Sequence, residues 1–458
     1  MSKKKKKKPK HLMGRKEFLF DFFSIVIVMG IGIYFGFRSI YYYSKQNVKI
    51  VEDSKTLNGV ILQNNQVITD GDGLYKDTDG YYFNGNVTNN YVLLGNSLFR
   101  IIRISKKNSI RIVSEDYVAS FPWGEEATYQ NSNIRLWLEK GENEHSGIYY
   151  NMIPNIESNF IKTSFYEESL VDHKMESIGE EYSDYVSLLT IRDYITAGGN
   201  KSFLNTGKLF YLLGYSDTQE NLYVEEDGSI QICDSLTGLG IRPVLTLKEN
   251  TAYTEGDGSL ANPYRLAFDK DNMSGKYVKL GGDIWRIYLS EGDTLRLHLN
   301  GYIKVNGNDY IRNYSNTNSI FDPSDKKNIA YYLNKDYLNS LSYGIMLLDC
   351  PSYIGEISDD QGYSFFNIYN QVVVTKVGLL NIFDPIVNPD LGNYFYVNTT
   401  SPVGSMEYDR FASGLLEESD VRDEKPIVPV VSIAKSAIIN GQGTILDPYV
   451  VEWNNEKN

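Results

Sequence analysis

YVLLGNSLFRIIRI, Tyr91 to Ile104, is the stretch around which the chain is organised, because it returns as YVKLGGDIWRIYLS, Tyr277 to Ser290. Tyr, Val, Leu, Gly, an aromatic residue, Arg and Ile recur at matching places. The alternating pattern predicts one strand over 91–104 and another over 277–289. Hairpin partners are expected at 109–114 and 294–299.

Five further motifs recur in the same order, which is the signature of a tandem duplication. They are NIRLWLE (133–139) and NIAYYLN (328–334), VSLLTIRDYITAGG (186–199) and VGLLNIFDPIVNP (377–389), LFYLLGYSD (209–217) and YFYVNTTSP (394–402), IRPVLTL (241–247) and IVPVVSI (427–433), and GDGSLANPY (256–264) and GQGTILDPY (441–449). We therefore predict two tandem α+β domains, at 70–268 and 269–453, called copy one and copy two below. Repetition indicates fold and leaves function open.

Short amphipathic helices are predicted inside the repeats. Ile134, Trp137 and Leu138 have the spacing of one apolar helix face, behind an expected Asn133 cap. Thr190, three residues before an Asp, has the spacing of a capping box. Both patterns are explained by core packing.

Phe99 and Trp285 occupy matching places in the repeated stretch, among Ile and Leu residues. We expect both aromatic side chains to be core anchors. Each is followed by an arginine, Arg100 or Arg286. A ligand-binding arginine is conceivable, but an arginine held by a structural carboxylate is the commoner arrangement.

The N-terminal part predicts a membrane anchor. Residues 1–17 include nine Lys and Arg residues and form the expected basic cytoplasmic tail. Residues 18–43 contain an apolar run with aromatic flanks, long enough for a transmembrane helix of about 30 Å. Residues 44–69 are expected to be a stalk and lead-in. Because no small-x-small cleavage pattern follows the run, we favour an uncleaved signal anchor over a signal peptide.

Charge and cysteine content exclude several classes of protein. Beyond the expected span, residues 44–458 carry 35 basic and 56 acidic side chains, a net charge of −21. This charge disfavours nucleic acid as a partner. Cys233 and Cys350 fall in different copies, which excludes a disulfide framework within a copy and a Cys-rich zinc site. We expect both to behave as small core residues.

A cluster of aspartates precedes the organising stretch. The segment TDGDGLYKDTDGYYFNG, Thr69 to Gly85, contains Asp70, Asp72, Asp77 and Asp79. Their alternating spacing with glycines is compatible with a calcium loop, although the EF-hand pattern is absent. Asp-Gly pairs between Tyr-rich segments are also typical of hairpin turns, the interpretation that we favour. Calcium is therefore a possible cofactor, and the sequence implies no other.

The sequence lacks a recognisable catalytic motif. Outside the predicted tail, its histidines are His145, His173 and His298, and none has a metal-binding spacing such as HExxH. No P-loop or GxSxG motif occurs. The acidic pairs 125–126, 167–168 and 180–181 are expected to be solvated. A glycosidase would need two carboxylates facing each other across a cleft, which a sequence does not reveal.

GLYKDT, YVLLGNSLFRIIRI, the TIRDYITAGG helix, GIRPVL and the closing GxGSxxNPY together resemble an uncharacterised family of bacterial membrane-anchored surface domains. The resemblance covers nearly all of 70–450 and implies C-type-lectin-like domains. The 188–197 helix and Gly240-Ile241-Arg242 are similar to formylglycine-generating-enzyme-type domains. Those enzymes need neighbouring cysteines, which this chain lacks. Calcium-dependent lectin motifs are matched only partly, at 388–390, and Arg242 becomes Val428 in copy two.

These observations predict a single-pass protein of a bacterial cell membrane, with a cytoplasmic N-terminus and an extracellular bulk. We expect a binding or adhesion protein that takes an extracellular glycan or protein ligand, and not an enzyme. A cell-envelope hydrolase of glycosidase type and an envelope scaffolding protein are the alternatives. No catalytic or ligand-binding residue is assigned from the sequence.

Overall fold

The computed structural model describes residues 56–452, except 125–127, 142–145, 172–173, 219, 319, 355–370, 386–393, 401–405 and 412. The predicted tail (1–17), the predicted transmembrane helix (18–43) and residues 44–55 of the predicted stalk lie outside the described residues. Within the described part, no helix has the length and apolar character needed to cross a membrane. Residues from Lys55 onward form one compact unit.

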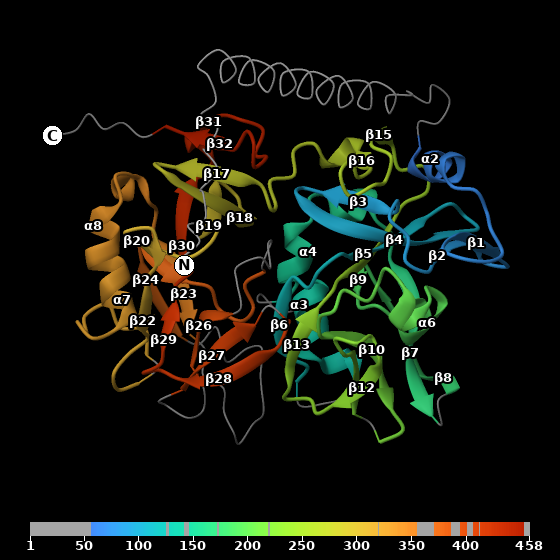
Figure 1. Cartoon of the computed structure of the whole chain (residues 1–458), viewed down its shortest axis with the longest axis horizontal. Coiled ribbons are helices and arrows are strands. Elements are labelled where there is room, and N and C mark those ends of the chain that lie inside the picture. The colour runs from blue at the N-terminus through green and yellow to red at the C-terminus, as the bar shows by residue number, and fades with distance from the viewer. Residues whose placement is uncertain are drawn as a thin grey trace, which may run out of the picture. The chain divides into compact units, whose positions relative to one another are not determined.

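The unit is a mixed α+β structure, rich in strands and with short helices, so the coarse fold-class prediction is confirmed (Figure 1). The helices are α2 (Leu57–Asn64), α3 (Asn133–Leu138), α4 (Ile148–Met152), α5 (Ile156–Asn159), α6 (Ile191–Thr196), α7 (Ile329–Tyr332) and α8 (Leu338–Ser340). Single turns of 3-10 type are η1 (Tyr129–Asn131), η2 (Gly199–Lys201), η3 (Ala267–Asp269), η5 (Gly344–Met346) and η7 (Lys435–Ala437), and η4 (Leu333–Tyr337) is a π turn.

Copy one is built on a sheet in which strands distant in sequence are neighbours. Its order is β9-β14-β5-β4-β3, and the hairpin β1–β2 pairs with the far end of β4. The strands are β1 (Gly73–Asp77), β2 (Gly80–Asn84), β3 (Tyr91–Leu94), β4 (Ser97–Ser105), β5 (Ile110–Ser114), β9 (Val186–Ser187) and β14 (Val244–Leu247).

Copy two has a sheet with the same order of matching strands, β25-β30-β19-β18-β17, followed by β32 and β31. Its strands are β17 (Tyr277–Leu280), β18 (Asp283–Glu291), β19 (Thr294–Leu299), β25 (Val377–Leu379), β30 (Pro429–Ala434), β31 (Ile438–Asn440) and β32 (Tyr449–Val451). Tyr449 in β32 pairs in parallel with Val278, as Tyr264 bridges to Val92 in copy one. The repeated motifs therefore fill equivalent strands.

The organising stretch is a hairpin, and the prediction of one strand over 91–104 was wrong. Leu94 pairs with Ser97, so Gly95 and Asn96 form a two-residue turn between β3 and β4. Gly95 has φ 60° and Gly281, its counterpart in copy two, has φ 59°. Two-residue hairpin turns require positive φ, which glycine adopts at little steric cost. The predicted partner strands at 109–114 and 294–299 are confirmed as β5 and β19.

A second, ten-stranded sheet crosses from copy one to copy two. Its order is β12-β11-β10-β13-β28-β27-β26, and Gly238 of β13 pairs with Leu416 of β28. A side chain at Gly238 would meet the Leu416 side chain at 2.7 Å, so only glycine permits this approach. The strands are β6 (Ala119–Pro122), β7 (Thr163–Val171), β8 (Lys174–Asp184), β10 (Phe210–Ser216), β11 (Asn221–Val224), β12 (Ile230–Cys233), β13 (Gly238–Ile241), β26 (Tyr394–Thr400), β27 (Met406–Phe411) and β28 (Leu416–Asp420).

The described residues also form four two-stranded sheets: β15 (Tyr253–Glu255) with β16 (Arg265–Leu266), β20 (Lys304–Val305) with β21 (Asn308–Asp309), β22 (Ile311–Asn313) with β29 (Glu424–Pro426), and β23 (Cys350–Ile354) with β24 (Gln371–Thr375). The larger hydrophobic core joins side chains of copy one to Tyr288, Leu380, Ile382 and Phe383 of copy two. The boundary between the copies at 268/269 stays a prediction, because the two copies share this core.

The predicted helix caps are partly confirmed. Thr190 accepts a hydrogen bond from the amide of Asp193 at the start of α6, and Asn328 caps α7. In α3 the cap is Ser132, which accepts from the Arg135 amide, so the assignment of Asn133 was wrong. Ser132 has the extended backbone of a cap, and Asn133 already belongs to the helix. The predicted apolar face of α3 is fully buried.

Candidate functional site

The four aspartates proposed as calcium ligands lie at the two ends of the β1–β2 hairpin. Asp70 and Asp72 precede β1, whereas Asp77 ends it and Asp79 lies in its two-residue turn. Five extended residues separate Asp72 from Asp77 by about 17 Å, too far for one ion to bridge. The hairpin turn expected from the Asp-Gly spacing is therefore confirmed.

The carboxylate of Asp77 forms an ion pair with an arginine of the same chain. Arg103 donates to both of its oxygens, at 3.1 and 2.8 Å, and the Asp79 amide donates at 2.8 Å. Burial acts to raise the pKa of Asp77, but the bonds from Arg103 and Asp79 outweigh it and lower that pKa. Across the described residues, no group of three or more His, Cys, Asp or Glu side chains could hold a metal ion.

Arg100 is a buried structural arginine, as predicted. Tyr91 pairs with Arg100 across β3 and β4, and the guanidinium lies between the rings of Tyr91 (4.0 Å) and Phe203 (4.7 Å). It donates to Asn90 at 2.7 Å and to the carboxylate of Glu115 at 3.3 Å. The predicted structural carboxylate is thus Glu115. Such cation–π contacts are strongest when the cation is desolvated.

The same cross-strand pair occurs in copy two. Arg286 pairs with Tyr277, and its guanidinium lies 4.2 Å from the centre of that ring. Arg286 is buried, like Arg100. The duplication has therefore retained an arginine stacked on a tyrosine, which argues for a packing role. A carboxylate partner for Arg286 stays a prediction.

A groove of about 330 Å³ opens over the Tyr91–Arg100–Phe203 stack. We call it the copy-one groove. Its remaining lining residues are Asn86, Glu115, Asp116, Asn205, Thr206 and Lys208. The whole lining, including Tyr91, Arg100 and Phe203, comes from four segments: the β2–β3 connection, the β3–β4 hairpin, the residues after β5, and the loop before β10. Of these lining residues, Arg100 is the one for which the sequence suggested a binding role.

The loop that forms one wall of the copy-one groove is fixed by backbone bonds. The Phe203 amide donates to the Gly85 carbonyl at 3.0 Å, and the Arg242 guanidinium donates to the Leu204 carbonyl at 2.6 Å. Arg242 is fully buried, donates also to the Ser114 carbonyl, and its pKa is lowered by burial to about 10. Through its hydrogen bonds to the carbonyls of Leu204 and Ser114, Arg242 therefore fixes the backbone next to the groove.

The charged groups of the copy-one groove are paired with one another. Arg100 pairs with Glu115, and the Lys208 ammonium contacts the Asp116 carboxylate. The Tyr91 hydroxyl donates to Glu115 at 3.3 Å, and burial, followed by the Glu115 charge, raises the pKa of Tyr91. The amides of Asn86 and Asn205 and the hydroxyl of Thr206 line the same groove. The Thr206 oxygen is buried and has no hydrogen-bond partner among the described residues.

The prediction that the paired acidic residues are solvated was wrong for one pair. Glu167 and Glu168 are buried, with 2% and 6% of their surface exposed. Glu168 pairs with Arg192 at 3.0 Å. Glu181 is exposed. The pair 125–126 lies outside the described residues.

Glu167, a residue of β7, is enclosed by Tyr129 and Tyr182. It accepts hydrogen bonds from the Tyr129 amide at 2.9 Å and the Tyr182 hydroxyl at 3.4 Å. Burial raises the pKa of Glu167 to about 7, although these two bonds act in the opposite direction. No arginine or lysine pairs with it in the contacts of the described residues. The pKa of this buried carboxyl group therefore lies close to neutral pH.

The histidine and cysteine side chains that the structure describes are buried or half-buried. His298 is fully buried beside Tyr288, and burial lowers its pKa to about 4. His145 and His173 lie outside the described residues. Both cysteines are free; Cys350 is a core residue, as predicted, and Cys233 is half-buried. Burial raises the pKa of the Cys233 thiol to about 12, which opposes thiolate reactivity.

The aromatic side chains of the organising stretch are core anchors, as predicted. Trp285 has 0% and Phe99 2% of its surface exposed. Trp285 belongs to the core of copy two and Phe99 to the larger shared core. Neither residue therefore forms an exposed ligand platform.

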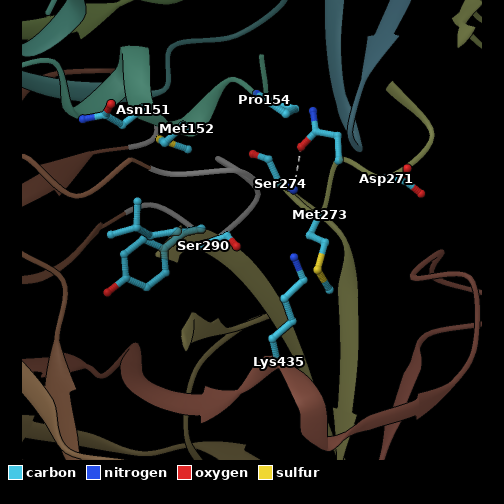
Figure 2. Close-up of a pocket in the computed structure, with 11 residues that line it drawn as sticks. Asn151, Met152, Pro154, Asp271, Met273, Ser274, Ser290 and Lys435 are labelled. Atoms are coloured by element: carbon cyan, nitrogen blue, oxygen red, sulfur yellow. Dashed lines mark hydrogen bonds between the residues drawn. The ribbon is translucent and has the colours of Figure 1, made fainter. Parts of the chain in front are cut away.

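A second cavity, of about 140 Å³, lies where the linker between the copies passes α4 and β18. Figure 2 shows the Lys435 side chain rising toward Met273, while Asp271 points away from that lysine. The Ser274 amide donates to Asn272 at 3.0 Å and fixes the linker there. The lining mixes methionine, asparagine and serine side chains without a concentrated set of binding groups. We regard the copy-one groove as the stronger candidate.

No protein-family model, curated protein or solved structure matches this chain.

Proposed function

We propose that this chain is a membrane-anchored extracellular binding protein with two tandem C-type-lectin-like α+β domains, and that the copy-one groove takes its ligand. The anchor rests on the basic tail and apolar run at 1–43, and the acidic exterior argues against nucleic-acid partners. The lectin-like fold rests on the resemblance of residues 70–450 to bacterial surface domains. The family membership rests on the same motifs.

The single observation that carries the binding site is the groove lined by Tyr91, Asn86 and Asn205 over a buried arginine stack. Rigid aromatic and amide side chains on a fixed loop are suited to polar ligands, because they present hydrogen-bonding groups at a small entropic cost. The charges of the groove are already neutralised in pairs. A glycan or an uncharged peptide segment fits this chemistry best.

Two measurements test the proposal. In intact cells, added protease should remove everything beyond about residue 44, and full protection of the C-terminus would contradict the orientation. The full chain, reconstituted in lipid nanodiscs, should bind members of a glycan array or a peptide array. Absence of binding on both arrays would contradict the proposal that this groove binds a glycan or an uncharged peptide.

A further inference from the structure

We propose that the hairpin β31–β32 of copy two, residues 438–451, lies on the outer surface of the bilayer in which the chain is anchored. This inference rests on the anchoring proposed above and adds a second membrane contact to it. The contact is made by aliphatic side chains that the fold leaves uncovered. We call these side chains the hairpin patch.

The hairpin patch consists of Ile439, Ile445, Leu446 and Val450, which are 57%, 54%, 94% and 41% exposed. Ile439 lies on β31, the edge strand of its sheet, and Val450 lies on the neighbouring strand. Asp447 is the one charged residue in the sequence 438–451. Aliphatic groups gathered on an edge hairpin mark an interaction surface, in contrast to scattered single apolar residues.

Copy one supplies an internal control. Its equivalent hairpin, β15–β16, carries Thr254, Leu260, Ala261 and Arg265 at the matching positions. Arg265 there pairs with Glu255 at 3.1 Å.

Both hairpins have a glycine at a position where a side chain would collide with a proline carbonyl. A side chain at Gly256 would meet the carbonyl oxygen of Pro263 at 2.2 Å, and one at Gly441 would meet that of Pro448 at 2.3 Å. The hairpin fold therefore also forms with Thr254 and Arg265 in place of Ile439 and Val450. Leu260, the counterpart of Ile445, is exposed in copy one as well (59%), so Ile439, Leu446 and Val450 are the aliphatic residues that distinguish copy two and that packing does not account for.

The place where residues 44–55, which we call the tether, join the unit favours the bilayer as the partner of the hairpin patch. Thr56, where the described chain begins, bridges to Ala252 directly before β15. Residues 44–55 separate it from the predicted span and reach at most about 40 Å when extended. In Figure 1, α2, β15, β16, β31 and β32 lie along one edge of the unit. The hairpin β31–β32 thus lies on the side of the unit where residues 44–55 join it.

The size and charge of the patch also favour lipid over a second copy of the chain. A stable protein interface uses roughly 20–30 residues a side, whereas the hairpin patch has four side chains on a three-residue edge strand. The apolar face of an interfacial helix is buried to a depth of about 5–10 Å at the boundary between headgroups and acyl chains, and we expect the aliphatic side chains of this hairpin to reach a similar depth. A hairpin with one charged residue is suited to a zwitterionic bilayer. Such a bilayer does not repel the acidic exterior part of the chain.

The test uses the full chain in phosphatidylcholine vesicles with a fluorescent label on Leu446→Cys, in a Cys233→Ser background that leaves the buried Cys350 unlabelled. Lipids brominated on the upper acyl chain should quench this label. The control is Ile232→Cys, an exposed aliphatic site on β12 at the opposite edge in Figure 1, where no quenching is expected. Adding Ile439→Thr and Val450→Arg, the copy-one residues, should abolish quenching at 446.

Each other outcome overturns the inference in a distinguishable way. A chain that sediments with vesicles but shows no quenching at 446 retains its anchor and lacks the second contact. A label shielded from aqueous iodide without lipid quenching would show a protein, such as a second copy, covering the patch. A chain that fails to sediment with vesicles would contradict both the anchor and the contact.

Discussion

The indole nitrogen of Trp137 in copy one donates a hydrogen bond of 2.9 Å to the carbonyl oxygen of Phe383 in copy two. The ring of Phe383 also packs 4.5 Å from that of Phe121 in copy one. This buried bond between the copies therefore lies within the core that they share.

We expect Trp137→Phe to lower the free energy of unfolding by about 1–3 kcal/mol, because it removes a buried hydrogen bond and keeps an aromatic ring. Denaturant unfolding of the full chain measures this. The matched control is Trp123→Phe, since Trp123 is equally buried and its indole nitrogen has no partner among the described residues. An equal loss in both variants would show that the bond contributes nothing beyond ring size.

Trp285 anchors the core of copy two, and we expect Trp285→Ala to lower the free energy of unfolding by about 3–5 kcal/mol through the cavity it leaves. The control is Ile311→Ala, at an exposed position that should change stability by less than about 0.5 kcal/mol. Chemical denaturation of the full chain compares them. If Trp285→Ala were as stable as the control, Trp285 would not anchor the core, and its strand would become a candidate ligand-binding site.

The duplication could be found from the sequence because packing residues tolerate little change. Tyr91, Phe99 and Arg100 fill one hairpin, and their counterparts fill the equivalent hairpin 186 positions on, so the motif and the fold coincide. The hairpin itself was mistaken for one strand because Gly95 and Asn96 interrupt the apolar pattern for only two residues. The turn chemistry of Gly-Asn was the available signal.

The copy-one groove could not be predicted, because its lining comes from segments brought together only by folding. Glu115 and Lys208 are far apart in sequence, and neither lies in a motif. The burial of Glu167 was missed for a similar reason. Its sequence neighbours look like a solvated acidic pair, whereas Tyr129 and Tyr182, from other segments, enclose the side chain.

Glu167 should make stability depend on pH. Its folded pKa, near 7, exceeds the ordinary value of 4.5, so between these pH values the folded state binds the extra proton. Stability should therefore fall as pH rises from about 4.5 to 7, by up to about 3 kcal/mol from this group. Glu167→Gln should lose that dependence, measured as the difference between wild type and variant in denaturant titrations. Parallel curves at all pH values would contradict it.

Calcium removal should leave the β1–β2 hairpin unchanged, because the carboxylates lie at opposite ends and Asp77 is paired with Arg103. The measurement is thermal unfolding of the full chain in calcium and in a chelator, with Asp77→Asn alongside. We expect equal midpoints in both buffers and a lower midpoint for Asp77→Asn in each. A rise with calcium that Asp77→Asn abolishes would establish the site.

The most direct test of the central claim is binding by groove-filled protein. Asn86→Trp places a large ring in the copy-one groove from an exposed position, and Asn151→Trp does the same in the second cavity as the matched control. For the strongest glycan or peptide found on the arrays, we predict that Asn86→Trp weakens binding by about tenfold or more, equivalent to about 1.4 kcal/mol, while Asn151→Trp binds as wild type does. Unchanged affinity in Asn86→Trp, or a loss confined to Asn151→Trp, would contradict the assignment of the copy-one groove.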